Sequence, residues 1–217
     1  MKKIKALSIV AAFIAAFAFS SCNSSSDNSF QWPSAQESSS MLSEVQGYHS
    51  AGLLLPASVN ANSNSTNADK FEKDSLTTTC VITSSDSTLT LQNVDVAKFA
   101  KYINDETISK EVAKLPAQDL KIKLIPYNYQ QRTFVTATND ITYTNEAGKK
   151  VQIQFYSGIN NLSYGGIGTR KDNSKRELIL NVTPGRILVD GSAKDVLKTY
   201  SYQGYNMPYV ATLEVVL

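Results

Sequence analysis

The sequence predicts a mainly β protein, an antiparallel β-sandwich or barrel of about eight strands with a helical pair inserted between the third and fourth strands. Three observations predict this class. Apolar and polar residues alternate over many short segments. Turn-forming pairs such as Pro184-Gly185 and Asp190-Gly191 separate these segments. Helical spacing is confined to two places, and strands bounded by turns favour antiparallel sheets over βαβ units.

The alternating segments place the strands. Asn145–Gly148 forms a good hairpin loop between two of them, and the polar residues 56–75 form a long surface loop. The last segment alternates up to Leu217, so we expect the C-terminus to be a strand built into the sheet. The predicted strands are residues 48–55, 76–82, 88–91, 120–124, 134–144, 149–156, 177–182, 187–189 and 209–217.

Three helices are predicted from spacing and capping residues. A short helix precedes the first strand, with Ser39 or Ser40 as its cap, and Gly47 ends it. The inserted pair begins after Asp95, which is placed to cap its first helix, and Pro116 ends the second. Residues 195–197 suggest one further helical turn. The apolar faces of the three helices are Met41, Leu42 and Val45; Val96, Phe99, Ala100 and Ile103; and Ile108, Val112 and Leu115.

The first twenty-two residues resemble a bacterial lipoprotein signal. Three lysines precede an apolar run, Ala6–Phe19, that is short for a membrane span, and two serines stand directly before Cys22. The resemblance implies cleavage before Cys22 and attachment of diacylglycerol and a fatty acid such as palmitate to this residue. A retained transmembrane anchor and an ordinary secretory signal are the alternatives.

This reading divides the chain into a signal peptide (1–21), a lipidated cysteine with a serine-rich tether (22–40) and a single mainly β domain (41–217). Loss of the leader removes three lysines, which leaves 18 Lys and Arg against 19 Asp and Glu in the 196 remaining residues. A nearly neutral chain lacks the basic footprint of a nucleic-acid binder. We therefore expect an outer-membrane lipoprotein whose partner is the membrane, with its periplasmic or cell-surface orientation left open.

Catalytic and metal-binding patterns are weak in this sequence, which predicts no catalytic residue, metal ligand or cofactor. His49 is the only histidine, so a two-histidine metal site is impossible. His49 and Ser50 are neighbours in a predicted strand and point to opposite faces. Cys80 reads as a buried, inert thiol. The glycine-rich segment 164–168 lacks the Gly-Lys-Ser/Thr ending of a phosphate loop and reads as a turn or bulge.

Tyrosines supply the binding candidates. The chain has eleven, and a tyrosine-rich segment near the C-terminus holds four, at Tyr200, Tyr202, Tyr205 and Tyr209. Exposed tyrosines stack on sugars or anchor protein partners, so a glycan or an envelope protein is the expected partner. The alternative is that these rings only cover sheet edges. Ser75 and Ser87 each follow an aspartate in a pattern that resembles the O-glycosylation signal of Bacteroidetes envelope proteins, and Ser75 is the better candidate.

The leader, the serine-rich tether and the segments MLSEVQGYHSAGLLL and VITSSDSTLTLQNVDVAKFAKYI together resemble uncharacterised lipoprotein families of gut Bacteroidetes. The resemblance implies an envelope location and a mainly β domain, and it assigns no reaction. A non-enzymatic binding or accessory module is the first functional hypothesis. There are two alternatives: a lipocalin-like carrier with a ligand chamber, and a carbohydrate-active enzyme that uses two carboxylates.

Overall fold

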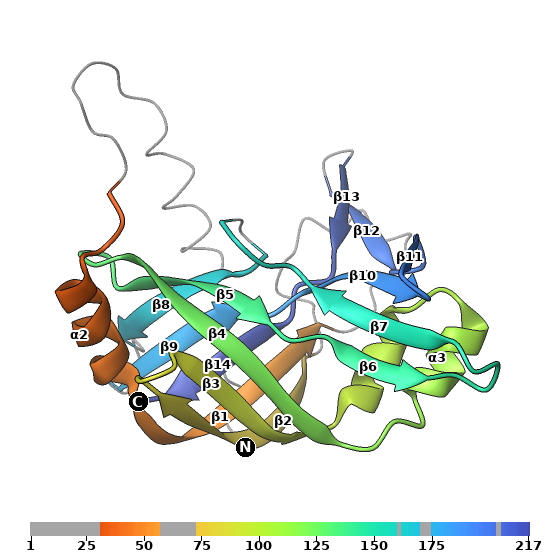
Figure 1. Cartoon of the computed structure of the whole chain (residues 1–217), viewed down its shortest axis with the longest axis horizontal. Helices are drawn as coiled ribbons and strands as arrows, with labels where there is room; N and C mark the ends of the chain where they lie inside the picture. Colours follow the sequence, from red (N-terminus) through yellow and green to blue (C-terminus); the bar gives the residue numbers. More distant parts are fainter. Residues whose placement is uncertain (1–30, 57–72, 160–161, 170–174, 203–204) are drawn as a thin grey trace.

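The protein folds around a closed antiparallel barrel, which decides between the two predicted architectures (Figure 1). The structure, a computed structural model, describes residues 31–56, 73–159, 162–169, 175–202 and 205–217. Around the barrel the strands run in the order β1-β14-β9-β8-β5-β4-β3-β2. They are β1 (Gly47–Pro56), β2 (Lys73–Thr83), β3 (Thr88–Val94), β4 (Gln118–Asn128), β5 (Thr133–Thr138), β8 (Tyr164–Thr169), β9 (Arg176–Asn181) and β14 (Thr212–Val216).

The barrel is an up-and-down meander in which each strand pairs with its neighbour along the chain. Two excursions interrupt it, between β5 and β8 and between β9 and β14. The last strand closes the ring, since β14 pairs with β9 on one side and with β1 on the other, where Leu53 lies opposite Leu213. The predicted C-terminal strand is thus confirmed as part of the barrel.

The two excursions build a second, four-stranded sheet in the order β11-β10-β7-β6. Residues 134–144, predicted as one strand, are split because Asn139 stays bound to β4: its N–H donates to the Lys121 carbonyl at 2.9 Å, and its Oδ1 accepts from the Lys121 N–H at 2.7 Å. The chain then leaves the barrel. The added strands are β6 (Ile141–Thr144), β7 (Lys150–Phe155), β10 (Pro184–Val189) and β11 (Ser192–Lys194).

Turns in the second sheet follow the prediction only in part. Asp190 and Gly191 form the tight β10–β11 turn with φ of 49° and 79°, as such two-residue hairpins require. Asn145–Gly148 connects β6 to β7 as predicted. Pro184 and Gly185, however, begin strand β10 at a bulge rather than forming a turn. The predicted helical turn at 195–197 is absent, because Leu197 forms a β-bridge with Ile103.

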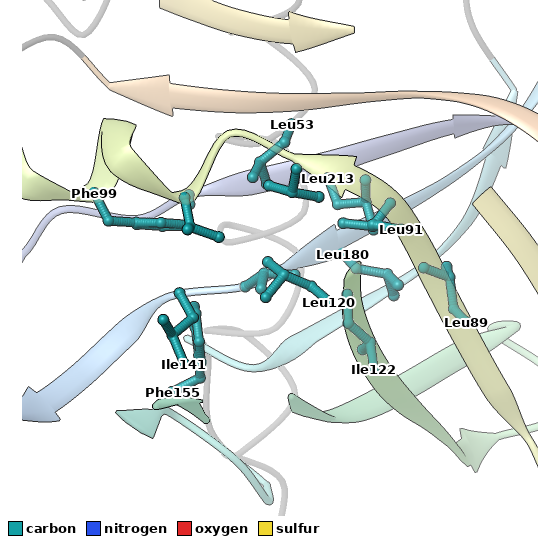
Figure 2. Close-up of a cluster of buried hydrophobic side chains, with 14 of the residues drawn as sticks. Leu53, Leu89, Leu91, Phe99, Leu120, Ile122, Ile141, Phe155, Leu180 and Leu213 are labelled. Atoms are coloured by element: carbon teal, nitrogen blue, oxygen red, sulfur yellow. The ribbon is translucent and has the colours of Figure 1, made fainter. Parts of the chain in front are cut away.

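Aliphatic side chains fill the interior of the barrel (Figure 2). Each of the ten below is at most 1% exposed, so none borders a space large enough for a water molecule. The ten come from β1, β3, β4, β9 and β14 and fill the interior between these strands. They are Leu53, Leu55, Leu89, Leu91, Leu120, Ile122, Leu124, Leu180, Leu213 and Val215.

Helices lie at both ends of the barrel. Helix α2 (Ala35–Val45) lies at the end where β1 begins and buries Met41, Leu42 and Val45. The inserted pair, η2 (Val96–Tyr102) and α3 (Glu106–Val112), connects β3 to β4 at the other end, as predicted. The Phe99 ring of η2 packs edge-on against the Phe155 ring of β7, with centroids 5.8 Å apart (Figure 2). One continuous core therefore joins the barrel to the second sheet.

Two helix starts differ from the prediction. Ser34, not Ser39 or Ser40, caps α2: its hydroxyl accepts from the Glu37 N–H, and the Glu37 carboxylate accepts from the Ser34 N–H. This backbone hydrogen bond is the main cause of the lowered pKa of Glu37. Residues 35–40, assigned to the tether, are thus helical. The segment after Asp95 is a 3₁₀ helix, and the Asp95 side chain does not cap it.

The glycine-rich segment 164–168, read as a turn or bulge, is barrel strand β8. A Cβ on Gly165 would lie 1.9 Å from the carbonyl oxygen of Ile179 in the neighbouring strand β9. Glycine is required at this position because the two backbones approach so closely. None of the helices in the described ranges is long and apolar enough to cross a membrane.

Candidate functional site

The predicted tyrosine-rich segment forms a separate β-hairpin. Strand β12 (Thr199–Tyr202) pairs with β13 (Tyr205–Pro208) in an antiparallel register that sets Tyr202 opposite Tyr205. Among the described strands neither pairs with the barrel or with the second sheet. The hairpin extends away from both, between β11 and β14 in the chain (Figure 1).

Two of the four candidate tyrosines pack at the base of this hairpin. Tyr209, 7% exposed, contacts Tyr200 on one side and Tyr102 of η2 on the other, with ring centroids 5.4 and 5.5 Å apart. A backbone hydrogen bond also connects the start of the hairpin to η2, since the Lys198 N–H donates to the Tyr102 carbonyl at 2.7 Å. Tyr209 is therefore buried at the base of the hairpin, and Tyr200 is half-buried against it.

Tyr205, at the start of β13, is 73% exposed. The side chain of Tyr202 lies outside the described residues. Tyr205 is the most exposed large hydrophobic residue in the described ranges. A phenol ring in this setting offers a flat apolar face and a hydrogen-bonding tip, which suits stacking on a sugar or anchoring a protein partner.

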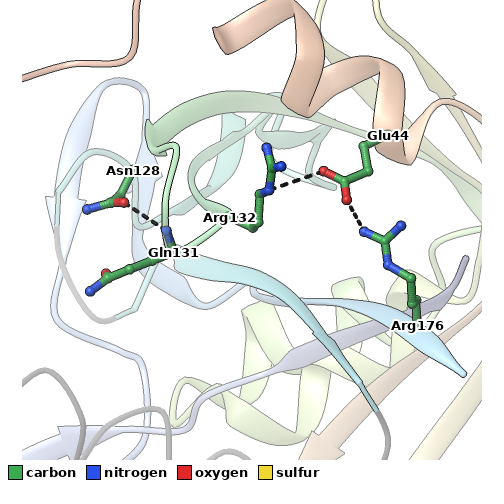
Figure 3. A network of polar contacts seen from close by, with 5 residues as sticks. All are labelled: Glu44, Asn128, Gln131, Arg132 and Arg176. Carbon is green, nitrogen blue, oxygen red and sulfur yellow. Dashed lines mark hydrogen bonds and ion pairs between the residues drawn. The ribbon is translucent and has the colours of Figure 1, made fainter. Parts of the chain in front are cut away.

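A charged cluster was not predicted from the sequence and connects α2 to the barrel (Figure 3). Glu44 of α2 pairs with Nε of Arg132, in the β4–β5 turn, at 3.5 Å and with Arg176 at the start of β9. The Arg132 guanidinium also lies over the Tyr129 ring at 4.4 Å. Glu44 thus bridges two arginines from different parts of the barrel, and these ion pairs hold the helix on the barrel end.

His49 and Cys80 have structural roles. The His49 Nε2 lies 3.0 Å from the Val45 carbonyl oxygen, which ties β1 to the last residue of α2. Cys80 is a fully buried free thiol, and desolvation raises its pKa to about 11. The thiol is therefore neutral at physiological pH.

The acidic side chains of the described ranges are exposed or half-buried, apart from one. Glu177 is the one buried acidic residue there, at 2% exposed. A glycosidase needs two carboxyl groups in one cleft, with the general acid in a site that raises its pKa. No group of three or more metal-ligating side chains occurs among the described residues either.

The modification sites remain predictions. Cys22 lies outside the described residues, as does the whole predicted signal peptide. Ser75 belongs to strand β2, opposite Leu54, rather than to the surface loop predicted for residues 56–75, and its side chain is not described. Ser87 is half-buried in the β2–β3 turn with φ of 54°, and its N–H donates to the Ser84 carbonyl.

These features define a class of protein: an eight-stranded antiparallel barrel with a filled interior, a second sheet and a projecting hairpin. The chain belongs to the DUF4840 family, a domain of unknown function, which matches residues 44–189. No curated protein and no solved structure matches the chain. The family match ends at the last residue of β10, so the hairpin and the closing barrel strand β14 both follow it.

Proposed function

We propose that this protein is a cell-envelope lipoprotein, held at the outer membrane through Cys22, that acts as a non-enzymatic binding or accessory module. The leader supports the anchor, because an apolar run of signal length ends at a cysteine preceded by small residues. The filled barrel supports a scaffold rather than a carrier, because inward-facing side chains occupy the space that a ligand would need.

The observation that carries the binding role is the hairpin β12–β13. Its base is packed against η2 through Tyr200 and Tyr209, while Tyr205 faces solvent. An aromatic side chain has only two rotatable bonds and so loses little conformational entropy on binding, which makes exposed aromatic residues frequent energetic anchors. The partner is a glycan or an envelope protein that contacts the Tyr205 ring.

Tyr205→Ala tests this role, and Tyr48→Ala is its matched control. Tyr48 lies on β1 of the barrel and is 67% exposed, so both changes remove an exposed ring. Loss of an anchor costs about 2 kcal/mol or more, so binding should weaken roughly thirtyfold for Tyr205→Ala. Tyr48→Ala should bind as the unchanged protein does, and both variants should melt at its temperature.

Binding is measured with the full mature chain in detergent, on an array of bacterial surface glycans and on immobilised outer-membrane protein fractions. Equal signals from Tyr205→Ala and the unchanged protein would remove the hairpin from the proposal. An equal loss for both variants would show that exposed tyrosines bind these probes without specificity, which also contradicts it.

A further inference from the structure

The only tryptophan of the chain, Trp32, lies on the outside of the barrel just before α2. Its ring packs edge-on against Tyr127 of β4, and Tyr127 packs edge-on against Tyr164 of β8, with centroids 5.6 and 5.7 Å apart. Trp32 remains 52% exposed. The three rings therefore form a continuous aromatic cluster in which Tyr127 and Tyr164 are half-buried, and we term it the Trp32 face.

Two lysines extend the Trp32 face along β4. Residues 120, 122 and 124 are buried in the core, and the alternating Lys121 and Lys123 are exposed on the outer side of β4, together with Asp119. Tryptophan and tyrosine prefer the boundary between lipid headgroups and acyl chains, and lysines near an anionic lipid surface are attracted to it. Aromatic rings next to exposed lysines are therefore suited to the headgroup region of a bilayer.

The chain places this face close to the proposed anchor. Trp32 follows Cys22 by ten residues, which span at most about 35 Å even when fully extended. Of the exposed large hydrophobic residues in the described ranges, Trp32 is the nearest to Cys22 along the chain. A lipid on Cys22 would hold the Trp32 face within reach of the membrane and so raise its effective concentration there.

We infer that the Trp32 face rests on the anionic lipid surface and fixes the orientation of the domain on the bilayer. This inference rests on the proposed lipid anchor. Because β5 lies four places from β1 in the eight-stranded ring, the β4–β5–β8 wall is opposite the wall that carries Tyr48. The wall around β1 thus faces away from the membrane, and the domain does not tumble freely on its tether.

Fluorescence of the single tryptophan tests this orientation. Lipidated full mature protein is placed in vesicles of phosphatidylethanolamine and phosphatidylglycerol, with or without bromine on the acyl chains near the headgroup. A tryptophan at the interface contacts the bromine, so Trp32 emission should be about twofold lower in brominated vesicles. Brominated vesicles without anionic lipid show whether the attraction between the lysines and anionic headgroups contributes. Quenching of Trp32 should be weaker in these vesicles.

A second reporter supplies the control. The double variant Trp32→Phe with Tyr48→Trp moves the only tryptophan to the opposite wall, and its emission should be equal in both kinds of vesicle. Equal quenching of the two reporters, or none for Trp32 in protein that floats with the vesicles, would overturn the inference and leave the anchor intact. Protein that fails to float would remove the anchor and the inference together.

Discussion

Deletion of residues 213–217 should abolish cooperative folding. These residues form most of β14, which pairs with β1 and β9 and closes the barrel. Their loss removes the fully buried Leu213 and Val215, each worth about 1.5–3 kcal/mol of apolar burial. It also leaves two strand edges unpaired and opens the core to water. Against a typical total stability of about 5–15 kcal/mol, the combined loss is decisive.

Circular dichroism during heating measures this effect, since a folded barrel melts in one sharp transition. Deletion of Leu217 alone is the matched control, because it follows β14 and its N–H makes one hydrogen bond, to the Arg176 carbonyl. We expect the control to melt cooperatively, a few degrees below the full chain. A five-residue truncation that melts as sharply and as late as this control would contradict the barrel closure.

Gly165→Ala should destabilise the protein by more than about 4 kcal/mol, which is exceptional for one methyl group. The added Cβ would lie 1.9 Å from the Ile179 carbonyl oxygen and 2.7 Å from the Leu180 Cα. Both are backbone atoms of β9, so relief requires the β8–β9 ladder to separate. Urea unfolding of the purified variant measures the change in the free energy of unfolding.

Gly52→Ala is the comparison for this substitution. Gly52 also lies in a barrel strand, β1, but an added Cβ there would meet no atom within 4 Å. We expect its free energy of unfolding to stay the same or rise slightly, because alanine reduces the freedom of the unfolded chain. Similar stabilities for the two variants would show that β8 and β9 do not approach as closely as described.

The sequence predicts seven of the eight barrel strands, because a strand with one buried face shows a local alternation of apolar and polar residues. Strand β8 was not predicted, because its glycines match a turn pattern. Glycine is needed there because the backbone at Gly165 approaches Ile179 of β9 closely, and no local sequence pattern shows this contact. Barrel closure was not predicted for the same reason, because it depends on the pairing of β1 with β14, which are separated by most of the chain. A sandwich and a barrel give the same alternation.

The candidate site was predicted only in outline. Four clustered tyrosines indicated a special segment, but which of them is buried depends on the contact between Tyr209 and Tyr102, which lies far away in the sequence. The start of α2 was predictable, since Ser34 and Glu37 form a capping box three residues apart. The Glu44 cluster was not, because its two arginines come from the β4–β5 turn and from strand β9, which are far apart in the sequence.

The central claim, a lipid anchor on Cys22, is tested most directly by the intact mass of protein extracted from the membrane. We expect a chain that begins at Cys22 and carries the added mass of a diacylglycerol and a further acyl chain. Cys80 cannot confuse the result, since its thiol is buried with a pKa raised to about 11. A mass showing the first twenty-one residues still attached and Cys22 unmodified would contradict the account.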